Sequence, residues 1–202
     1  MFDPEKPAYY LHPAYLPAAG PVSDTIDPAT LEKAGVVGEP DAGQLAGVID
    51  AVNAAQKDWK QLDAKSRAKI LHQVATAIET ADLSRCAELM SREMGKPYPD
   101  AIGELANCAP IFRYYAEMAR DEAGKIAGTT QTGSFQYVRY EPLGVSVHIM
   151  PFNFPVLLMC WTVAASLAAG NGCIVKPAPA TTLSTLEFMR CFAALPKGLI
   201  AS

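Results

Sequence analysis

The sequence lacks the features that mark nucleic-acid-binding, membrane-bound and metal-binding proteins. Its formal net charge of -4 gives no basic surface for nucleic acid or anionic membranes. Its longest apolar run, residues 156–169, is too short to cross a bilayer, and no signal peptide is recognisable at its start. The five cysteines form no Cys-x-x-Cys pair and have no histidine at metal-ligand spacing. We therefore expect a cytoplasmic protein with reduced thiols, no metal, no nucleic-acid partner and no membrane contact.

Hydrophobic residues are abundant by contrast, at half of the 202 positions. A chain of this length and composition can bury a sizeable core in one large domain or two small ones. No internal repeat or low-complexity tract is present.

The last third of the chain predicts a strand, a helix and a second strand. The run Val145–Met150 follows a Pro-Leu-Gly turn signal and stops at Pro151, which is typical of a buried strand. Residues 156–169 predict a buried helix, and residues 173–175 a second strand. A helix of about 14 residues rises roughly 21 Å, and a six-residue strand spans roughly 20 Å. The lengths therefore suit a crossover between parallel strands.

Two polar side chains follow these strands, Asn153 after the first and Lys176 after the second. Ligands of parallel α/β sheets bind beyond the carboxyl ends of the strands, so we expect both side chains to face one crevice. Two simpler roles stay open. Asn153 in its proline-rich turn could bond to its own backbone, and Lys176 could be a solvated loop residue.

Apolar periodicity predicts helices through the middle and near the end of the chain. The first covers 43–60 and follows Asp41, the second is capped by Asp63, and the third is closed by Gly95. Residues 100–119 continue helically and are bent or divided by Pro110, and residues 182–194 form a further helix. The inward face of the first helix is expected to carry Leu45, Val48, Ile49, Val52, Ala55 and Trp59.

The remaining segments carry weaker signals. Residues 1–40, with seven prolines, suggest an extended arm on the surface of the fold, or alternatively a disordered leader. The loop signals at Gly124, Gly128, Thr129-Thr130 and Gly133 precede a strand at Phe135–Tyr140, whose open edge calls for a partner segment or subunit. Residues 199–202 begin a third apolar strand.

The order of short motifs resembles the amino-terminal portion of the aldehyde dehydrogenase superfamily from about Asp24 to Ser202. The matching motifs are Asn53-Ala-Ala-Gln with Trp59, Arg67-Ala-Lys-Ile-Leu71, Glu93-Met-Gly-Lys-Pro97, Tyr114-Tyr-Ala116, Glu141-Pro-Leu-Gly144, Pro151-Phe-Asn-Phe-Pro155, Ala168-Ala-Gly-Asn171 and Lys176-Pro177.

The resemblance implies an α/β fold, the amino-terminal part of a Rossmann-type cofactor domain. Residues 1–40 would be the amino-terminal arm, 41–130 the helical part of the domain, 131–145 a strand of an oligomerisation hairpin, and 146–202 the first βαβ strands. The catalytic domain would lie outside this chain. The assembly implied is a homodimer or homotetramer.

The resemblance also implies roles for individual residues. Asn153 would be the side-chain half of an oxyanion hole, and Lys176 would bond to the adenosine ribose of NAD or NADP. Ile149, Met150, Pro151 and Phe152 would line the cofactor cleft. An amide donor is needed because thiolate attack on an aldehyde creates an alkoxide that must be stabilised before hydride leaves.

Three departures from the family pattern stand out. Phe152 replaces a tryptophan that is common at this point, and either ring can fill the cleft wall. Ala178 and Pro179 stand where many members have a serine and then a glutamate that holds both ribose hydroxyls, so NAD and NADP both stay open. The nucleophilic cysteine, the general-base glutamate and the glycine-containing turn would follow Ser202.

No cysteine or histidine of this chain offers a substitute for that machinery. The cysteines lie in predicted helices or apolar strands and are expected to be structural, with Cys173, near Lys176, the least improbable exception. His12 and His72 have no evident partner in the sequence, and His148 is expected to be a satisfied core or cleft histidine.

The main hypothesis is thus an oxidoreductase that converts an aldehyde to a carboxylic acid through a cysteine thiohemiacetal, with this chain carrying only part of the machinery. One alternative is a truncated, non-catalytic nucleotide-binding or assembly module. Another is a purely structural fragment of a larger protein.

Overall fold

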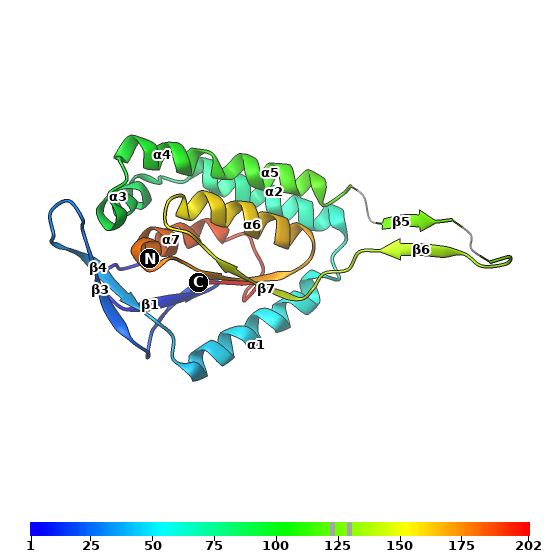
Figure 1. Ribbon diagram of the computed structural model, residues 1–202, viewed down its shortest axis with the longest axis horizontal. Coiled ribbons are helices and arrows are strands. Elements are labelled where there is room, and N and C mark those ends of the chain that lie inside the picture. Colours follow the sequence, from blue (N-terminus) through cyan, green and yellow to red (C-terminus); the bar gives the residue numbers. More distant parts are fainter. Residues whose placement is uncertain (122–123, 129–130) are drawn as a thin grey trace.

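The computed structural model describes residues 1–121, 124–128 and 131–202 and is built around a five-stranded sheet (Figure 1). Its strands are ordered β2-β1-β9-β8-β7. The parallel part consists of β7 (Val145–Ile149), β8 (Gly172–Lys176) and β9 (Ile200–Ala201). The antiparallel strands β1 (Ala8–Leu11) and β2 (Ala14–Pro17) extend it beyond β9. The predicted parallel βαβ unit is confirmed.

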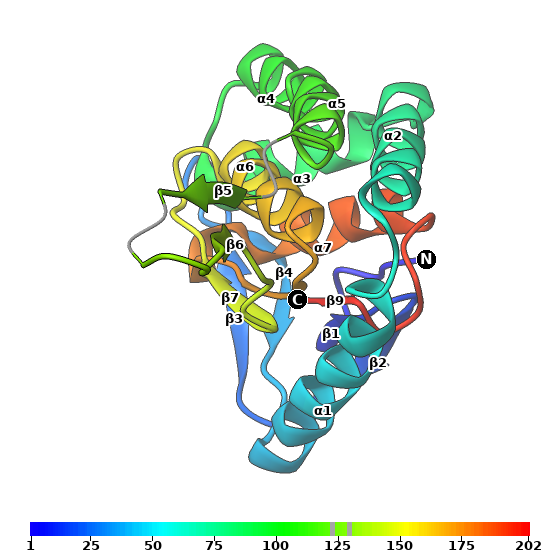
Figure 2. The same cartoon turned by 90° about the vertical axis from the view of Figure 1, so that its right-hand side faces the viewer.

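Helices cover the two faces of this sheet unequally (Figures 1 and 2). One face packs against α1 alone, and the other against α6 and α7 with a second helical layer beyond them. The helices are α1 (Ala42–Trp59), α2 (Ala64–Thr80), α3 (Ser84–Met94), α4 (Tyr98–Ala106), α5 (Cys108–Met118), α6 (Pro155–Ala168) and α7 (Thr182–Phe188), with single 3-10 turns at η1 (Pro179–Thr181) and η2 (Met189–Phe192).

Local signals set the ends of the first three helices as predicted. Asp41 and Gln44 form a reciprocal capping box at the start of α1. The Asp63 side chain accepts the Ser66 amide, 2.7 Å away, at the start of α2. Gly95 ends α3 with a left-handed φ of 78°, which glycine adopts without steric cost.

The expectation of a surface arm at residues 1–40 is corrected. This segment forms two antiparallel hairpins, β1–β2 and the separate β3 (Val22–Ile26) with β4 (Lys33–Gly38). Tyr10 in β1 is fully buried, and its backbone pairs with Ser202 beside β9. Strands of four to six residues between prolines are too short to show a clear alternation of apolar and polar residues, which is why they read as irregular.

The hairpin begins earlier than the expected range of 131–145. Its first strand, β5 (Gly124–Ala127), pairs antiparallel with β6 (Gln136–Arg139), so the partner of the aromatic strand is supplied by this chain. A glycine is required at 124, because a Cβ there would lie 2.0 Å from the Val138 carbonyl oxygen. The predicted loop residues Thr129 and Thr130 lie outside the described residues.

Two other expectations about helices needed revision. The 100–119 segment is divided at Asn107, and Pro110 lies in the first turn of α5, where its missing N–H costs no helical bond. On α1, Leu45 and Ile49 are exposed, although both were expected on the inward face.

Strand β7 is less buried than its apolar sequence suggested. Val147 is 63% exposed and Ile149 72% exposed, because β7 is at the edge of the sheet and α1 reaches only part of that face. His148, on the α6 side, is buried. In the described ranges, no helix has the length and apolar content needed to cross a membrane.

Candidate active site

The structure brings Asn153 and Lys176 to the same edge of the sheet. Lys176 is the last residue of β8 and stands opposite Ile149, the last residue of β7. The Met150 amide donates to the Lys176 carbonyl oxygen at 3.0 Å, and the turn that carries Asn153 follows directly. The prediction that both residues follow the carboxyl ends of neighbouring parallel strands is confirmed.

Both side chains are exposed, and their polar groups are little used by the protein itself. The Asn153 amide makes no hydrogen bond to any residue that the structure describes, so the simpler role of capping its own backbone is not observed. Within the described residues, the Lys176 ammonium makes a single long contact, of 3.4 Å, with the Pro177 carbonyl oxygen. Both side chains therefore have donors that the described part of the protein leaves largely unused.

The other predicted cleft residues divide into two groups. Ile149, Pro151 and Phe152 are exposed beside Asn153. Met150 is buried in the main hydrophobic core, so only its backbone can face a ligand.

Lys96 contacts the backbone of the Asn153 turn and holds it in place. This role was not predicted from the sequence. The Lys96 ammonium donates to the Asn153 carbonyl oxygen at 2.8 Å and lies 4.1 Å from the centroid of the Phe154 ring. It also forms an ion pair with Glu104. The Glu104 carboxylate in turn accepts the amides of Val156 at 2.9 Å and Leu157 at 3.0 Å, in the first turn of α6.

A second buried carboxylate holds the start of α7, beyond the Lys176 turn. Glu93 accepts the amides of Leu183 at 2.7 Å and Ser184 at 2.9 Å, and the Ser184 hydroxyl also donates to it. Burial outweighs these hydrogen bonds and raises the pKa of Glu93 to about 7. Glu93 and Lys96 were quoted only as parts of a motif. The signal that could have revealed them is the pair of charged residues within the short motif 93–97, which lies between two helices with apolar faces.

The histidines are occupied elsewhere, and two expectations about them were wrong. His12 contacts the Tyr10 hydroxyl at 2.7 Å and the Leu195 carbonyl oxygen at 2.9 Å. His72 pairs with Glu117 at 2.8 Å. His148 lies within hydrogen-bond distance of Ser146, at 2.9 Å, as a satisfied histidine should. Burial lowers the pKa of His12 and of His148, so both favour the neutral ring.

The five cysteines are all buried and form no disulfide with one another. Burial raises the pKa of Cys173 to about 12 and of Cys191 to about 11, and it also raises the pKa values of Cys86 and Cys160 well above the usual value. A nucleophile needs the opposite shift. Among the described residues, no group of three or more potential ligands could hold a metal ion.

An apolar groove of about 440 Å³ runs between α5 and α6. Leu157, in the first turn of α6, lines it together with aromatic side chains. Its lining residues are Asn107, Pro110, Ile111, Tyr114, Tyr115, Leu157 and Trp161.

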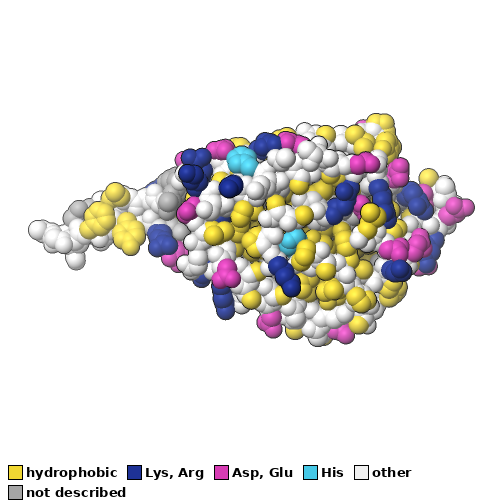
Figure 3. All heavy atoms as spheres, turned by 180° about the vertical axis from the view of Figure 1, so that it is seen from behind, with side chains coloured by type: hydrophobic (Ala, Val, Ile, Leu, Met, Phe, Trp, Pro, Cys, Tyr) yellow, Lys and Arg dark blue, Asp and Glu magenta, His cyan; other side chains and the backbone are white. Residues whose placement is uncertain are grey.

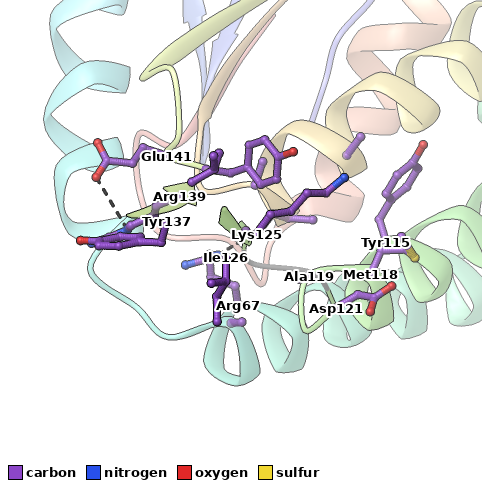
Figure 4. Close-up of a pocket in the computed structure, with 17 residues that line it drawn as sticks. Arg67, Tyr115, Met118, Ala119, Asp121, Lys125, Ile126, Tyr137, Arg139 and Glu141 are labelled. Atoms are coloured by element: carbon purple, nitrogen blue, oxygen red, sulfur yellow. Dashed lines mark hydrogen bonds and ion pairs between the residues drawn. The ribbon is translucent and has the colours of Figure 1, made fainter. Parts of the chain in front are cut away.

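A larger hollow, of about 690 Å³, lies at the base of the hairpin (Figure 4). Arg67 and Tyr115 line it from the helices, and Tyr137 and Arg139 line it from β6, where Arg139 pairs with Glu141 at 3.7 Å. Neither Asn153 nor Lys176 borders it, so this hollow is separate from the crevice.

Comparison with known proteins gives one consistent answer. A model described as "Aldehyde dehydrogenase family" matches residues 15–202. Retinaldehyde dehydrogenase 3 of Rattus norvegicus is 37% identical over 174 residues, which are 84% of this chain and 34% of that protein. Alpha-ketoglutaric semialdehyde dehydrogenase of Bacillus subtilis is 34% identical over 168 residues, 82% of this chain and 34% of that protein.

Solved structures agree in fold. The 3,6-anhydro-L-galactose dehydrogenase in complex with NAP superposes with a TM-score of 0.89 at 28% identity, covering 98% of this chain and 42% of that one. PnpE in complex with nicotinamide adenine dinucleotide gives a TM-score of 0.88 at 28% identity, covering 98% and 41%. The chain thus spans about a third of these curated relatives and about two fifths of these solved chains.

Proposed function

The chain belongs to the aldehyde dehydrogenase family and forms the amino-terminal part of its nucleotide-binding fold, and on that premise we propose that the protein oxidises an aldehyde to a carboxylic acid with NAD or NADP. The observation that carries the proposal is the side-chain amide of Asn153, which lies beyond the end of β7 and bonds to none of the described residues, while the Asn153 carbonyl oxygen is held by Lys96.

In this proposal Asn153 donates a hydrogen bond to the oxygen of the aldehyde as it becomes an alkoxide. A preformed donor is effective because no reorganisation is needed when charge develops. The proline on each side and the Lys96 bond to the Asn153 carbonyl oxygen restrict the backbone, so the amide is aimed in advance. The nucleophile that completes the reaction is proposed to lie outside this chain.

Lys176 is proposed to hold the cofactor rather than to take part in chemistry. Its exposed ammonium at the end of β8 suits the hydroxyls of an adenosine ribose. Bound NAD or NADP would supply the hydride acceptor. Ile149, Pro151, Phe152 and the backbone of Met150 would border it. Ala178 and Pro179 provide no side-chain acceptor for the ribose, which leaves room for either dinucleotide.

The groove between α5 and α6 is proposed to receive the apolar part of the aldehyde. Leu157, which lines it, lies in the first turn of the helix that follows the Asn153 turn, and Tyr114 and Trp161 present exposed aromatic surface to it. Such a wall favours a hydrocarbon or aromatic substituent through burial of apolar area.

The test is turnover of a panel of aliphatic and aromatic aldehydes by the protein at its natural length. We expect NADH or NADPH to accumulate and Asn153→Ala to abolish most of the rate. Titration calorimetry with each dinucleotide distinguishes the alternative of a non-catalytic binding module. Binding without turnover would support that alternative, and neither binding nor turnover would contradict both.

We also propose that the β5–β6 hairpin joins subunits into a homodimer or homotetramer. The hairpin projects from the body, and Figure 3 shows hydrophobic side chains on it. Its apolar and aromatic side chains Ile126, Phe135, Tyr137, Val138 and Tyr140 are all exposed. Light scattering on the protein and on Tyr137→Ser checks this assignment. A monomeric parent would contradict it.

A further inference from the structure

We propose that Lys96 and Glu104 are positioning residues for Asn153, and that this ion pair fixes the backbone from which the Asn153 amide reaches its ligand. The inference rests on the proposed function for its catalytic consequence. Its structural part, that the pair orders the Asn153 turn and the start of α6, stands independently and is tested separately below.

Glu104 provides the fixed point. Its side chain is completely buried, and both carboxylate oxygens are used: one accepts the Val156 and Leu157 amides, and the other pairs with Lys96. These amides belong to the first turn of α6, where a helix has no backbone acceptors of its own to offer. Glu104 therefore holds the helix that starts immediately after the Asn153 turn.

Lys96 connects the buried Glu104 carboxylate to the Asn153 turn. Its side chain is 9% exposed, and its ammonium is placed by three contacts, to Glu104, to the Asn153 carbonyl oxygen and to the face of the Phe154 ring. The bond goes to the main chain of Asn153, so the backbone is held while the side-chain amide stays free. Gly95, with its left-handed φ of 78°, turns the chain just before Lys96.

An ion pair in this place calls for an explanation other than stability. Replacing a buried pair by well-packed apolar residues is often neutral or stabilising, so such a pair adds little to folding on its own. Its directed bonds do specify geometry. Here those bonds end at the Asn153 carbonyl oxygen and at the first turn of α6, which follows it.

The decisive test is a double-mutant cycle between Lys96→Met and Asn153→Ala in the protein at its natural length. We expect Lys96→Met to lower kcat about 10- to 100-fold, as misplacement of a reacting group does, with the KM for the dinucleotide unchanged. In the Asn153→Ala background the same substitution should lower kcat by less than about threefold, since the amide that Lys96 positions is already absent. Equal losses in both backgrounds would overturn the proposal.

Lys33→Met is the matched control, because it removes the same side chain from an exposed ion pair with Asp24, 2.8 Å across. It should leave kcat and KM unchanged. If Lys96→Met does not fold, as seen from its circular dichroism, Lys96→Gln keeps one donor for the Asn153 carbonyl and enters the same cycle.

Hydrogen exchange at the Val156 and Leu157 amides separates this inference from the proposed function. Lys96→Met should speed their exchange at least about tenfold, as loss of local ordering does, while Lys33→Met should not. Faster exchange in a protein that oxidises no aldehyde would support the ordering role and contradict the function. Unchanged exchange would overturn the ordering role, whatever the activity.

Discussion

The starts of α6 and α7 each contact a buried glutamate, but the two glutamates differ in whether a lysine pairs with them. At each, a buried glutamate from the outer helices accepts two backbone amides, Glu104 at α6 and Glu93 at α7. Glu104 faces the ammonium of Lys96. Glu93 accepts the Ser184 hydroxyl besides those amides and has no ion-pair partner among the described residues, and burial raises its pKa to about 7.

The difference teaches where a counter-charge is needed. The turn before α6 carries Asn153, whose amide must be aimed, and there the carboxylate is joined to the turn through Lys96. Lys176 ends β8, and the η1 turn lies between it and the start of α7 that Glu93 holds. A flexible lysine needs less precise placement. Both helix starts therefore use a buried carboxylate to accept backbone amides, but Lys96 ties the carboxylate to the preceding turn at α6.

The largest expected effect comes from removing each carboxylate. Glu104→Ala should lower the free energy of unfolding by about 3–5 kcal/mol, because the Lys96 charge is left buried without its partner. Glu93→Ala should cost about 1–3 kcal/mol, since it leaves unsatisfied amides but no unpaired charge. Urea denaturation of both variants measures the difference, and equal costs would mean that the counter-charge is irrelevant.

The next effect compares the two turns. Asn153→Ala should lower kcat by about 10²- to 10³-fold, as loss of an oxyanion donor does. Lys176→Ala should instead weaken dinucleotide binding by about tenfold or more through the loss of a charged hydrogen bond. Steady-state kinetics and calorimetry on the two variants separate these outcomes. A Lys176→Ala variant that binds the dinucleotide with normal affinity would contradict the proposed role of Lys176 in cofactor binding.

A pH dependence should distinguish Glu93 from its glutamine variant. Because the pKa of Glu93 is about 7 in the folded chain against a usual value of 4.5, the folded state holds a proton that the unfolded state has lost between these values. The free energy of unfolding should therefore fall as pH rises from about 4.5 to 7 and then level off. Denaturation of the wild type and Glu93→Gln across this range checks it, and the variant should lack this component.

The smallest expected effect concerns Ser184. Ser184→Ala removes the hydroxyl that donates to Glu93 and should cost about 1 kcal/mol. Because that hydrogen bond lowers the pKa of Glu93, its loss should move the pH transition upward. Thr185→Ala, which removes a hydroxyl bonded to the Thr181 carbonyl in the same helix, is the control and should leave the transition in place.

Sequence reasoning succeeded where the determinants are local. The caps at Asp41, Asp63 and Gly95 are set by neighbouring residues, as predicted, and the strands expected at 145–150 and 173–175 correspond to β7 and β8. These strands were enough to place Asn153 and Lys176 on one edge of the sheet.

It failed where partners are far apart along the chain. Glu104 lies 52 residues from the Val156 amide that it accepts, and no periodicity records such a pairing. The same reason hid β1, whose neighbour β9 follows it only after all the other strands and helices named above, and left the open face of β7 unforeseen.

The pairing of β1 with β9 has a consequence for the order of folding. The backbone of Tyr10 exchanges two hydrogen bonds with Ser202, so this part of the sheet cannot close until Ser202 has been synthesised. Contacts of such long sequence separation form slowly, since the loop must be closed before the bonds are made. During translation the first two strands emerge long before their neighbour, and Tyr10 must stay outside its core until β9 arrives.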